Sequence, residues 1–211
     1  MFSFTAAKDN LFVAHEWLPS LAFSIFYDSF GYNFMIVLKA LFFGLCFLLA
    51  YRLSYKISKN PLVAFFLASF SLFTLNYRSF MRPETVAYIF LFTQLSLLWD
   101  YKEKRKLSLL LTYLLVHVVW VNSHGSFLIS IALPGLLAAG KKSDNLILNL
   151  IFKEKNKLFT NYEGKLILLS LASCLLSLLN PYGYHLLTHS YELSQNEALK
   201  RTVLELSLIH I

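Results

Sequence analysis

The sequence of 211 residues contains little charge, since Asp, Glu, Lys and Arg together make up only 15% of it. Soluble domains carry about 25% charged residues, so this deficit argues against an ordinary soluble domain. Hydrophobic residues make up 57% of the chain and aromatic residues 17%, and the mean hydropathy is +0.56. The composition therefore indicates a protein whose solvent is lipid.

Cysteines are also few, and no internal repeat or signal peptide is visible. Cys46 and Cys174 lie in apolar runs, so they are expected to behave as small hydrophobic residues and do not indicate a redox compartment. The first thirty residues lack a basic segment followed by an apolar core, so we expect no cleavable signal peptide. The net charge of +7 would suggest a nucleic-acid partner in a soluble protein. Here the lysines lie in loops between apolar runs, so membrane orientation explains them and no nucleic acid is expected.

The apolar runs predict an all-α integral membrane protein with about six transmembrane helices, because about 20 apolar residues span a bilayer as a helix. The expected spans form a bundle within residues 34–180, preceded by an outer loop over 1–33 and followed by an outer segment over 181–205. Within the first loop, residues 18–30 are apolar and aromatic but contain Pro19 and Asp28, which predicts an interfacial helix. The spans are expected at residues 34–51, 62–77, 84–99, 107–121, 126–139 and 166–180.

The distribution of Lys and Arg predicts the orientation. Residues 52–61, 100–106 and 140–165 hold 13 of them, whereas the alternate loops hold 5. By the positive-inside rule the first set is cytoplasmic. The polar residues that do not look like solubilising charge then gather on the outer side, which would be explained by a shared outer cavity. They are Asp9, His15, Glu16, Trp17, Arg78, Arg82, Glu84, Asn122, His124, Asn180, Tyr182, His185 and His189.

Two of these groups lie at the start of a span or between two spans. Arg82 and Glu84 flank Pro83, which fits the first turn of a helix, and Glu84 complements the helix dipole there. Alternatively, Arg82 grips a phosphate at the membrane surface, which suits guanidinium geometry. Asn122 and His124 lie in an uncharged link, which is either a tight turn or part of a site, because polar groups at membrane depth need partners.

Two further groups flank the bundle. After the last span, Asn180 and Tyr182 precede a glycine and a second tyrosine, and this segment is either a helix terminator with interfacial aromatics or part of the site. In the first loop, Trp17 either anchors an interfacial helix capped by Glu16 or belongs to a site in which Asp9 or Glu16 is a general base. There His15 would orient that carboxylate or contact phosphate.

Metal binding is not indicated by the spacing of the histidines. His185 and His189 are four residues apart, as on one helical face, but no glutamate lies between them as in zinc enzymes. We therefore expect no metal or cofactor.

Four segments resemble a group of bacterial multi-spanning proteins related to the C-type glycosyltransferases, the class that includes the polyprenyl-phosphate-sugar-dependent mannosyltransferases. In chain order the segments are FSFTAAKDNLFVAHEWLPSLAFSIFY, MRPETVAYIFLF, WVNSHGSFLIS and LLNPYGYHLL. The resemblance implies a membrane enzyme that transfers sugar from a polyprenyl-phosphate donor to a glycan, lipid or protein acceptor. It also implies a site on the outer face of the bacterial cytoplasmic membrane.

The resemblance also implies that the chain is a fragment. In that class an essential acidic residue follows the first span, and the match here begins downstream of that place, so Glu16 and Asp9 are the remaining candidate catalytic acids. An acidic-Trp-x-Pro-like motif is expected near residue 205, where the chain reads Leu204-Glu205-Leu206. The last six residues, LSLIHI, look like the translation of a transposase sequencing adapter. We therefore expect residues 206–211 to be foreign and the fragment to have little activity alone.

An alternative from another class is a non-enzymatic transport or envelope-assembly protein. It would need a polar pathway through the bilayer. Lys39 and His117 are the main ionisable residues deep in the expected spans, and no span is lined with carboxylates, which disfavours a pump.

Overall fold

The computed structural model describes residues 16–76, 83–151 and 160–188, and all regular secondary structure in these ranges is helical. The all-α prediction is therefore confirmed for this part of the chain. The runs expected at 34–51, 84–99 and 107–121 each fall within one helix, whereas those at 126–139 and 166–180 cover an α-helix and an adjoining 3₁₀ turn, and the described part of 62–77 lies in one helix. The elements are α1 (Trp17–Ser58), α2 (Pro61–Asn76), α3 (Pro83–Lys104), α4 (Leu107–Val121), η1 (Gly125–Phe127), α5 (Leu128–Ile151), α6 (Asn161–Leu176) and η2 (Ser177–Leu179).

Within the described residues, two helical segments are long and apolar enough to cross a membrane, namely Trp17–Ser58 and Asn161–Leu179. Apolar helices at Pro61–Thr74 and Leu107–Val121 are shorter. The most apolar window of α1 is only 11% buried within the protein, and that of Asn161–Leu179 is 28% buried. These helices therefore differ from the core helices of a soluble protein, which bury most of their apolar surface.

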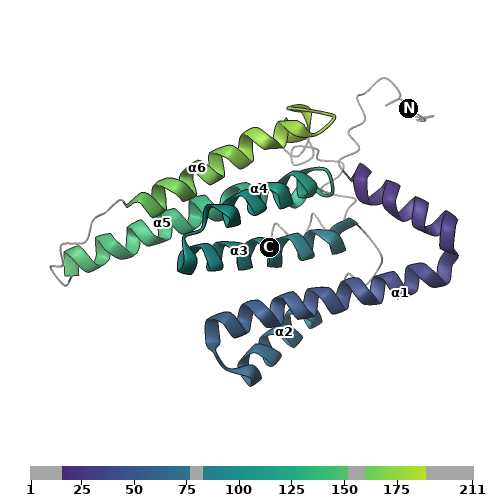
Figure 1. Cartoon of the computed structure of the whole chain (residues 1–211), viewed down its shortest axis with the longest axis horizontal. Helices are drawn as coiled ribbons and strands as arrows, with labels where there is room; N and C mark the ends of the chain where they lie inside the picture. Colours follow the sequence, from purple (N-terminus) through teal and green to yellow (C-terminus); the bar gives the residue numbers. More distant parts are fainter. Residues whose placement is uncertain (1–15, 77–82, 152–159, 189–211) are drawn as a thin grey trace, which may run out of the picture.

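The interfacial helix expected at 18–30 and the span expected at 34–51 are joined in one bent helix, α1. The bend lies at Gly31, whose φ of 74° and ψ of −176° are not helical. This region of backbone space is essentially accessible only to glycine. A Cβ at this position would meet no atom within 4 Å, so the glycine is required by the backbone conformation and not by packing. Gly31 thus divides α1 into two arms that point in different directions (Figure 1).

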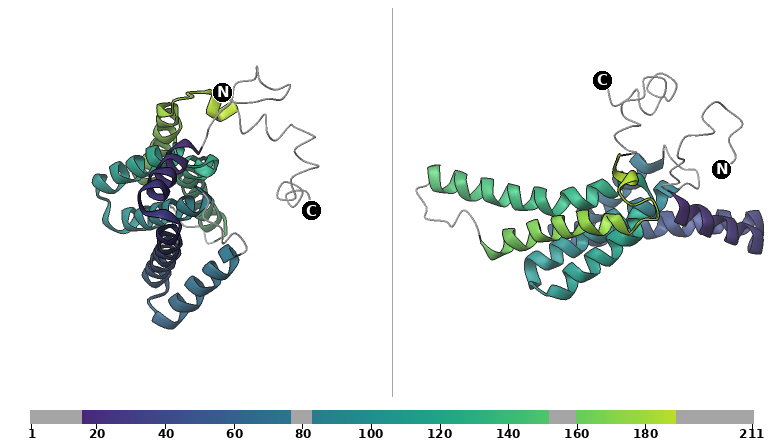
Figure 2. Two further views of the ribbon diagram at one scale, coloured as in Figure 1. Left: turned by 90° about the vertical axis from the view of Figure 1, so that its right-hand side faces the viewer. Right: turned by 90° about the horizontal axis from the view of Figure 1, so that it is seen from above.

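The second arm of α1 packs against α2 and α3, and α4 packs against both α3 and α6. Helices α3 to α6 run alongside one another, with α5 paired to α6 (Figures 1 and 2). Helix α4 rises about 22 Å over its 15 residues. Its two ends, near Arg105 and Asn122, therefore mark two well-separated ends of the bundle.

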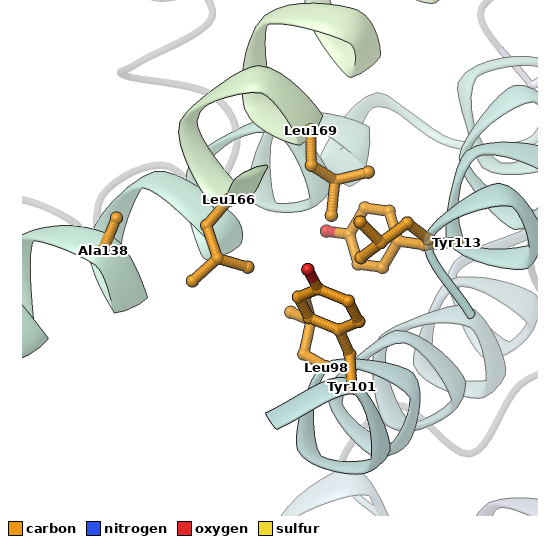
Figure 3. Close-up of a cluster of buried hydrophobic side chains, with 7 residues drawn as sticks. Leu98, Tyr101, Tyr113, Ala138, Leu166 and Leu169 are labelled. Carbon is orange, nitrogen blue, oxygen red and sulfur yellow. The ribbon is translucent and has the colours of Figure 1, made fainter. Parts of the chain in front are cut away.

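The hydrophobic core near the Arg105 end contains side chains from α3, α4, α5 and α6 (Figure 3). Tyr101 and Tyr113 belong to it and are at most 1% exposed. Tyrosines this deeply buried are expected to have a hydrogen-bond partner. The remaining buried members are Leu98, Leu110, Ala138, Leu166 and Leu169.

A buried network of hydrogen bonds in the same bundle compensates for a proline inside α5. Pro134 lies inside α5 and has no N–H to donate to the carbonyl of Ser130, four residues earlier. The hydroxyl of Tyr113 donates to that carbonyl instead, at 2.6 Å. The hydroxyl of Ser170 likewise bonds the next carbonyl, that of Ile131, at 2.5 Å. Helix α5 therefore tolerates its proline because a neighbouring helix satisfies the carbonyl that the proline frees.

His117 connects this network to η2, the 3₁₀ turn that follows α6. Its Nδ1 lies 2.8 Å from the hydroxyl of Ser130, and its Nε2 lies 3.1 Å from the hydroxyl of Ser177. All three side chains belong to residues that are 0% exposed. Of the two ionisable residues expected deep in the spans, Lys39 and His117, the histidine is thus a buried core residue with both ring nitrogens hydrogen-bonded.

Candidate functional site

Three of the candidate site residues, Asp9, His15 and Arg82, lie outside the described residues. The other seven are described, and they come from the start of α1, the start of α3, the link between α4 and α5, and the segment after α6. Five of them form what we call the Asn122 cluster, at the end of the bundle where α4 ends. Its members are Glu16, Trp17, Asn122, His124 and Asn180.

The link after α4 is a tight turn. Helix α4 ends at Val121, and the N–H groups of Ser123 and His124 both bond to the carbonyl of Trp120. The hydroxyl of Ser123 donates to the carbonyl of Val119 at 2.7 Å. Asn122 and Ser123 are both buried. The turn therefore holds its polar side chains inside the fold, where each needs a partner.

Asn122 is the centre of the cluster. Its Oδ1 accepts hydrogen bonds from Nε1 of Trp17 at 3.1 Å and from Nδ2 of Asn180 at 3.2 Å. Its own Nδ2 donates to the carbonyl of Val118 at 2.8 Å. One amide thus joins three segments that are more than fifty residues apart in the sequence.

Backbone bonds attach the start of α1 to the same turn. The N–H of Leu18 belongs to the first turn of α1 and has no partner within its own helix. It donates to the carbonyl of Asn122 at 3.2 Å. Nδ2 of Asn180 also donates to the carbonyl of Val121 at 3.3 Å. The start of α1 is therefore fixed to the end of α4 by main chain as well as side chain.

Glu16 pairs with His124, and this differs from the capping role considered from the sequence. Glu16 is the N-cap residue of α1, but its side chain makes no capping hydrogen bond. Its Oε1 lies 3.2 Å from Nε2 of His124, and the two side chains are 31% and 20% exposed. The carboxylate therefore contacts an imidazole at the surface of the cluster.

The other nitrogen of His124 is directed towards Ser126. The backbone N–H of Ser126 donates to Nδ1 at 3.1 Å, and the hydroxyl of Ser126 lies 2.7 Å from the same atom. Because Nδ1 accepts from that N–H, we infer that the proton of the neutral ring is on Nε2 and faces Glu16. Nε1 of Trp120 donates to the Ser126 hydroxyl at 3.1 Å. Glu16, His124 and Ser126 thus form a continuous chain, in which the carboxylate lies at ion-pair distance from the ring and the ring is hydrogen-bonded to the serine.

Two pockets adjoin the cluster on different sides. One has a volume of about 510 Å³ and is lined by Trp17, Asn122, Asn180 and mainly apolar residues of α1, α4 and η2. The other has a volume of about 210 Å³, and Glu84 and His124 line it. Its remaining lining residues are Ala87, Tyr88, Leu91, Trp120, Ser126 and Ile129. Mostly apolar pockets with a few convergent polar groups are typical of ligand sites.

Glu84 and Tyr182 lie beside the cluster. Glu84 is in the first turn of α3 and lines the smaller pocket. Tyr182 packs against the buried cluster that contains Trp120 and Leu186, and its N–H bonds to Oδ1 of Asn180 at 3.0 Å. Tyr182 is therefore partly a packing residue, whereas Glu84 faces the pocket that His124 also lines.

Sequence reasoning did not single out Trp120 and Ser126 as candidates, although both lie in the link that it considered. Their role depends on the hydroxyl of Ser126, which joins the indole to the imidazole. The spacing of His124 and Ser126 could have indicated this contact. A histidine two residues before a serine can cap a short helix, and His124 accepts from the N–H of Ser126 at the start of η1.

The arrangement can accept and move a proton. A histidine hydrogen-bonded to a carboxylate is a common general base, because the carboxylate orients the ring and stabilises its protonated form. Among the described residues, no three His, Cys, Asp or Glu side chains are grouped so that they could hold a metal ion. The described residues therefore place an acid–base pair, Glu16 and His124, beside two pockets.

Comparison of the chain with protein-family models, with curated proteins and with solved structures gives no match.

Proposed function

We propose that this chain belongs to an integral membrane glycosyltransferase of the C type, and that the Asn122 cluster is part of its site on the outer face. The enzyme would transfer a sugar from a polyprenyl-phosphate donor to a glycan, lipid or protein acceptor. The observation that carries the proposal is the convergence of Glu16, Trp17, Asn122, His124 and Asn180 at one end of the bundle.

The exposed apolar surface supports a location within the membrane. On α2, Leu62, Phe66 and Phe73 are 68%, 69% and 75% exposed. Large apolar patches on soluble monomers are rare outside binding surfaces. Lipid is the solvent in which such faces are stable, and the shorter helices would then cross it together with α1 and α6.

In the proposed reaction, the hydroxyl of Ser126 takes the proton of an acceptor hydroxyl and passes its own proton to Nδ1 of His124, because Nε2 of His124 faces Glu16. The acceptor oxygen forms a bond to the anomeric carbon of the sugar, which passes through an oxocarbenium-like state. The bond from that carbon to the phosphate oxygen breaks, and the lipid phosphate leaves with the electron pair. Arg82, outside the described residues, would compensate the charge of the leaving phosphate.

This mechanism changes the role expected for Glu16. A carboxylate that is 3.2 Å from an imidazole is placed to orient the ring and to stabilise its protonated form. The proposed base is therefore the pair, with His124 as the group that takes the proton. Trp17 and Trp120 lie next to the two pockets, where an aromatic ring can stack against a sugar.

The test is a transfer assay with the purified full-length protein in liposomes that contain polyprenyl-phosphate sugars. Glu16→Gln and His124→Gln should each lower turnover by about 10²–10⁴-fold, the usual contribution of general acid–base catalysis. Glu103→Gln is the matched control, because Glu103 is an exposed carboxylate near the other end of α3. It should leave turnover unchanged.

Two results would count against the proposal. Full turnover in both the Glu16 and the His124 variants would remove the pair from the chemistry. No turnover of any lipid-linked donor by the folded wild-type protein would instead favour the transport or envelope-assembly alternative.

A further inference from the structure

A third pocket, lined by polar and charged side chains, lies at the Arg105 end of the bundle, where α3 ends and α6 begins. Its volume is about 300 Å³. It is separated from the Asn122 cluster by the length of α4, about 22 Å. The lining residues are Tyr101, Arg105, Thr160, Asn161, Tyr162 and Lys165.

The side chain of Arg105 is held in place by aromatic stacking. Its guanidinium carbon lies 3.9 Å from the centre of the Tyr162 ring and 5.9 Å from that of Tyr101. The two rings are themselves stacked, with centroids 5.9 Å apart and an interplanar angle of 20°. Stacking uses the face of a guanidinium and leaves the N–H donors at its edge available to a ligand.

The backbone of Arg105 is also unusual. Its φ of 55° lies in the left-handed region, which few residues other than glycine adopt. Its N–H bonds to the carbonyl of Tyr101 at 3.0 Å and ends α3. Lys59 ends α1 in the same conformation, so the left-handed backbone of Arg105 is a helix terminator. With this backbone conformation, the side chain of Arg105 lies over Tyr101 in the last turn of α3 and over Tyr162 in the first turn of α6.

Positive charge predominates in this pocket. Lys165 is the second cation and lies one helical turn after Asn161, on the same face of α6. Among the described residues, no carboxylate pairs with Arg105 or Lys165. Asp100 pairs with Lys56 at 2.8 Å and lies near Lys104, at 3.8 Å. Glu163 accepts from the N–H of Thr160 at 2.8 Å and does not line the pocket.

We propose that this pocket binds a phosphate group. Arg105 would grip two phosphate oxygens with its fork of donors, and Lys165 would supply a second charge. The amide of Asn161 is a further polar group at the pocket wall, whereas the hydroxyl of Thr160 donates to Glu163 and accepts from the N–H of Tyr162 in the capping box of α6. The phosphate is either that of a lipid headgroup at the membrane surface or free phosphate in solution. This inference does not depend on glycosyl transfer.

The experiment measures binding to the purified full chain in detergent micelles. The probes are radiolabelled inorganic phosphate and a radiolabelled short-chain phosphatidic acid, with phosphatidylcholine of the same chains as the lipid control. The variants are Arg105→Gln, Arg105→Lys and Lys165→Gln. Lys142→Gln is the matched control, because Lys142 is an exposed lysine on α5 that does not line the pocket. Circular dichroism checks that each variant keeps its helicity.

Arg105→Gln and Lys165→Gln should each weaken phosphate binding about tenfold, the usual effect of losing one hydrogen bond to a charged group. Arg105→Lys should also weaken it, because lysine keeps the charge but loses the fork and the stacking. Tighter binding of phosphatidic acid than of inorganic phosphate would identify the lipid as the source, and the reverse would identify the soluble ion. Failure of the wild type to bind either probe, or equal losses in Lys142→Gln, would overturn the proposal. Neither result would bear on transfer activity at the other end.

Discussion

Two histidines in this protein have similar partners and different access to solvent. Nδ1 of His117 lies 2.8 Å from the hydroxyl of Ser130, and Nδ1 of His124 lies 2.7 Å from that of Ser126. His117 is 0% exposed and its second nitrogen contacts another serine. The side chain of His124 is 20% exposed, its second nitrogen contacts Glu16, and it lines a pocket.

The comparison shows that hydrogen-bond partners alone do not distinguish a structural histidine from a candidate catalytic one. In the buried network around His117, the polar groups are hydrogen-bonded to one another and to the Ser130 carbonyl that Pro134 leaves without its helical partner. In the Asn122 cluster, similar bonds hold an imidazole and a carboxylate where a substrate could reach them. Substitutions in the buried network, in the Asn122 cluster and at the bend of α1 should therefore have different effects, and the largest loss of stability is expected in the buried network.

His117→Ala should lower the free energy of unfolding by about 3 kcal/mol, because it leaves a cavity and removes two buried hydrogen bonds. The measurement is the midpoint of thermal unfolding in detergent micelles. Leu115→Ala is the control, because Leu115 lies on the same helix and is 69% exposed. It should change stability by no more than about 0.5 kcal/mol in detergent. Equal losses in the two variants would mean that the network does not stabilise the bundle.

Asn122→Ala should lower the free energy of unfolding by about 2 kcal/mol, because it removes the acceptor shared by Trp17 and Asn180. Trp17→Phe removes one of the two donors, so the double variant should lose less than the sum of the single losses. The same thermal unfolding measurement serves for all three proteins. Strict additivity would show that the bond between Trp17 and Asn122 does not couple α1 to α4.

Gly31→Ala should have the smallest effect on stability, about 1 kcal/mol, because alanine is strained at the observed backbone angles. The bend at Gly31 directs the first arm of α1, which carries Glu16 and Trp17. We therefore expect the fluorescence of Trp17 to change, which can be read in a variant whose other tryptophans are replaced by phenylalanine. Gly44→Ala is the control, because Gly44 lies in the helical second arm and a Cβ there would also meet nothing within 4 Å. A larger fluorescence change in the control would contradict this role for the bend.

Local composition predicted most of the helices well. Helix α4 was expected at residues 107–121 and is found at Leu107–Val121, because charged residues precede this apolar run and polar residues follow it. The span expected at residues 126–139 is part of a longer helical stretch, because α5 continues to Ile151. Lys141 and Lys142, which follow the expected span, lie inside this helix. Lysines are good helix formers, so a change in polarity did not end the helix.

The contacts of the candidate site were less predictable. The sequence placed Glu16, Trp17, Asn122, His124 and Asn180 at helix ends on one side of the bundle. It did not indicate that Asn122 accepts from Trp17 and Asn180, or that Glu16 pairs with His124. Such contacts depend on how α1, α4 and α6 are oriented, and the bend at Gly31 contributes to that orientation.

The sequence by itself determined that the described part of this protein is helical and has much apolar surface. The physical reason is that helix formation and burial in an apolar solvent depend on the composition of each segment. Only the tertiary structure decided which polar groups are sealed and which face a pocket. Pro134, Tyr113 and His117 form an internal network because three helices meet around them, whereas His124 and Glu16 meet at the end of the bundle, where the helices leave space.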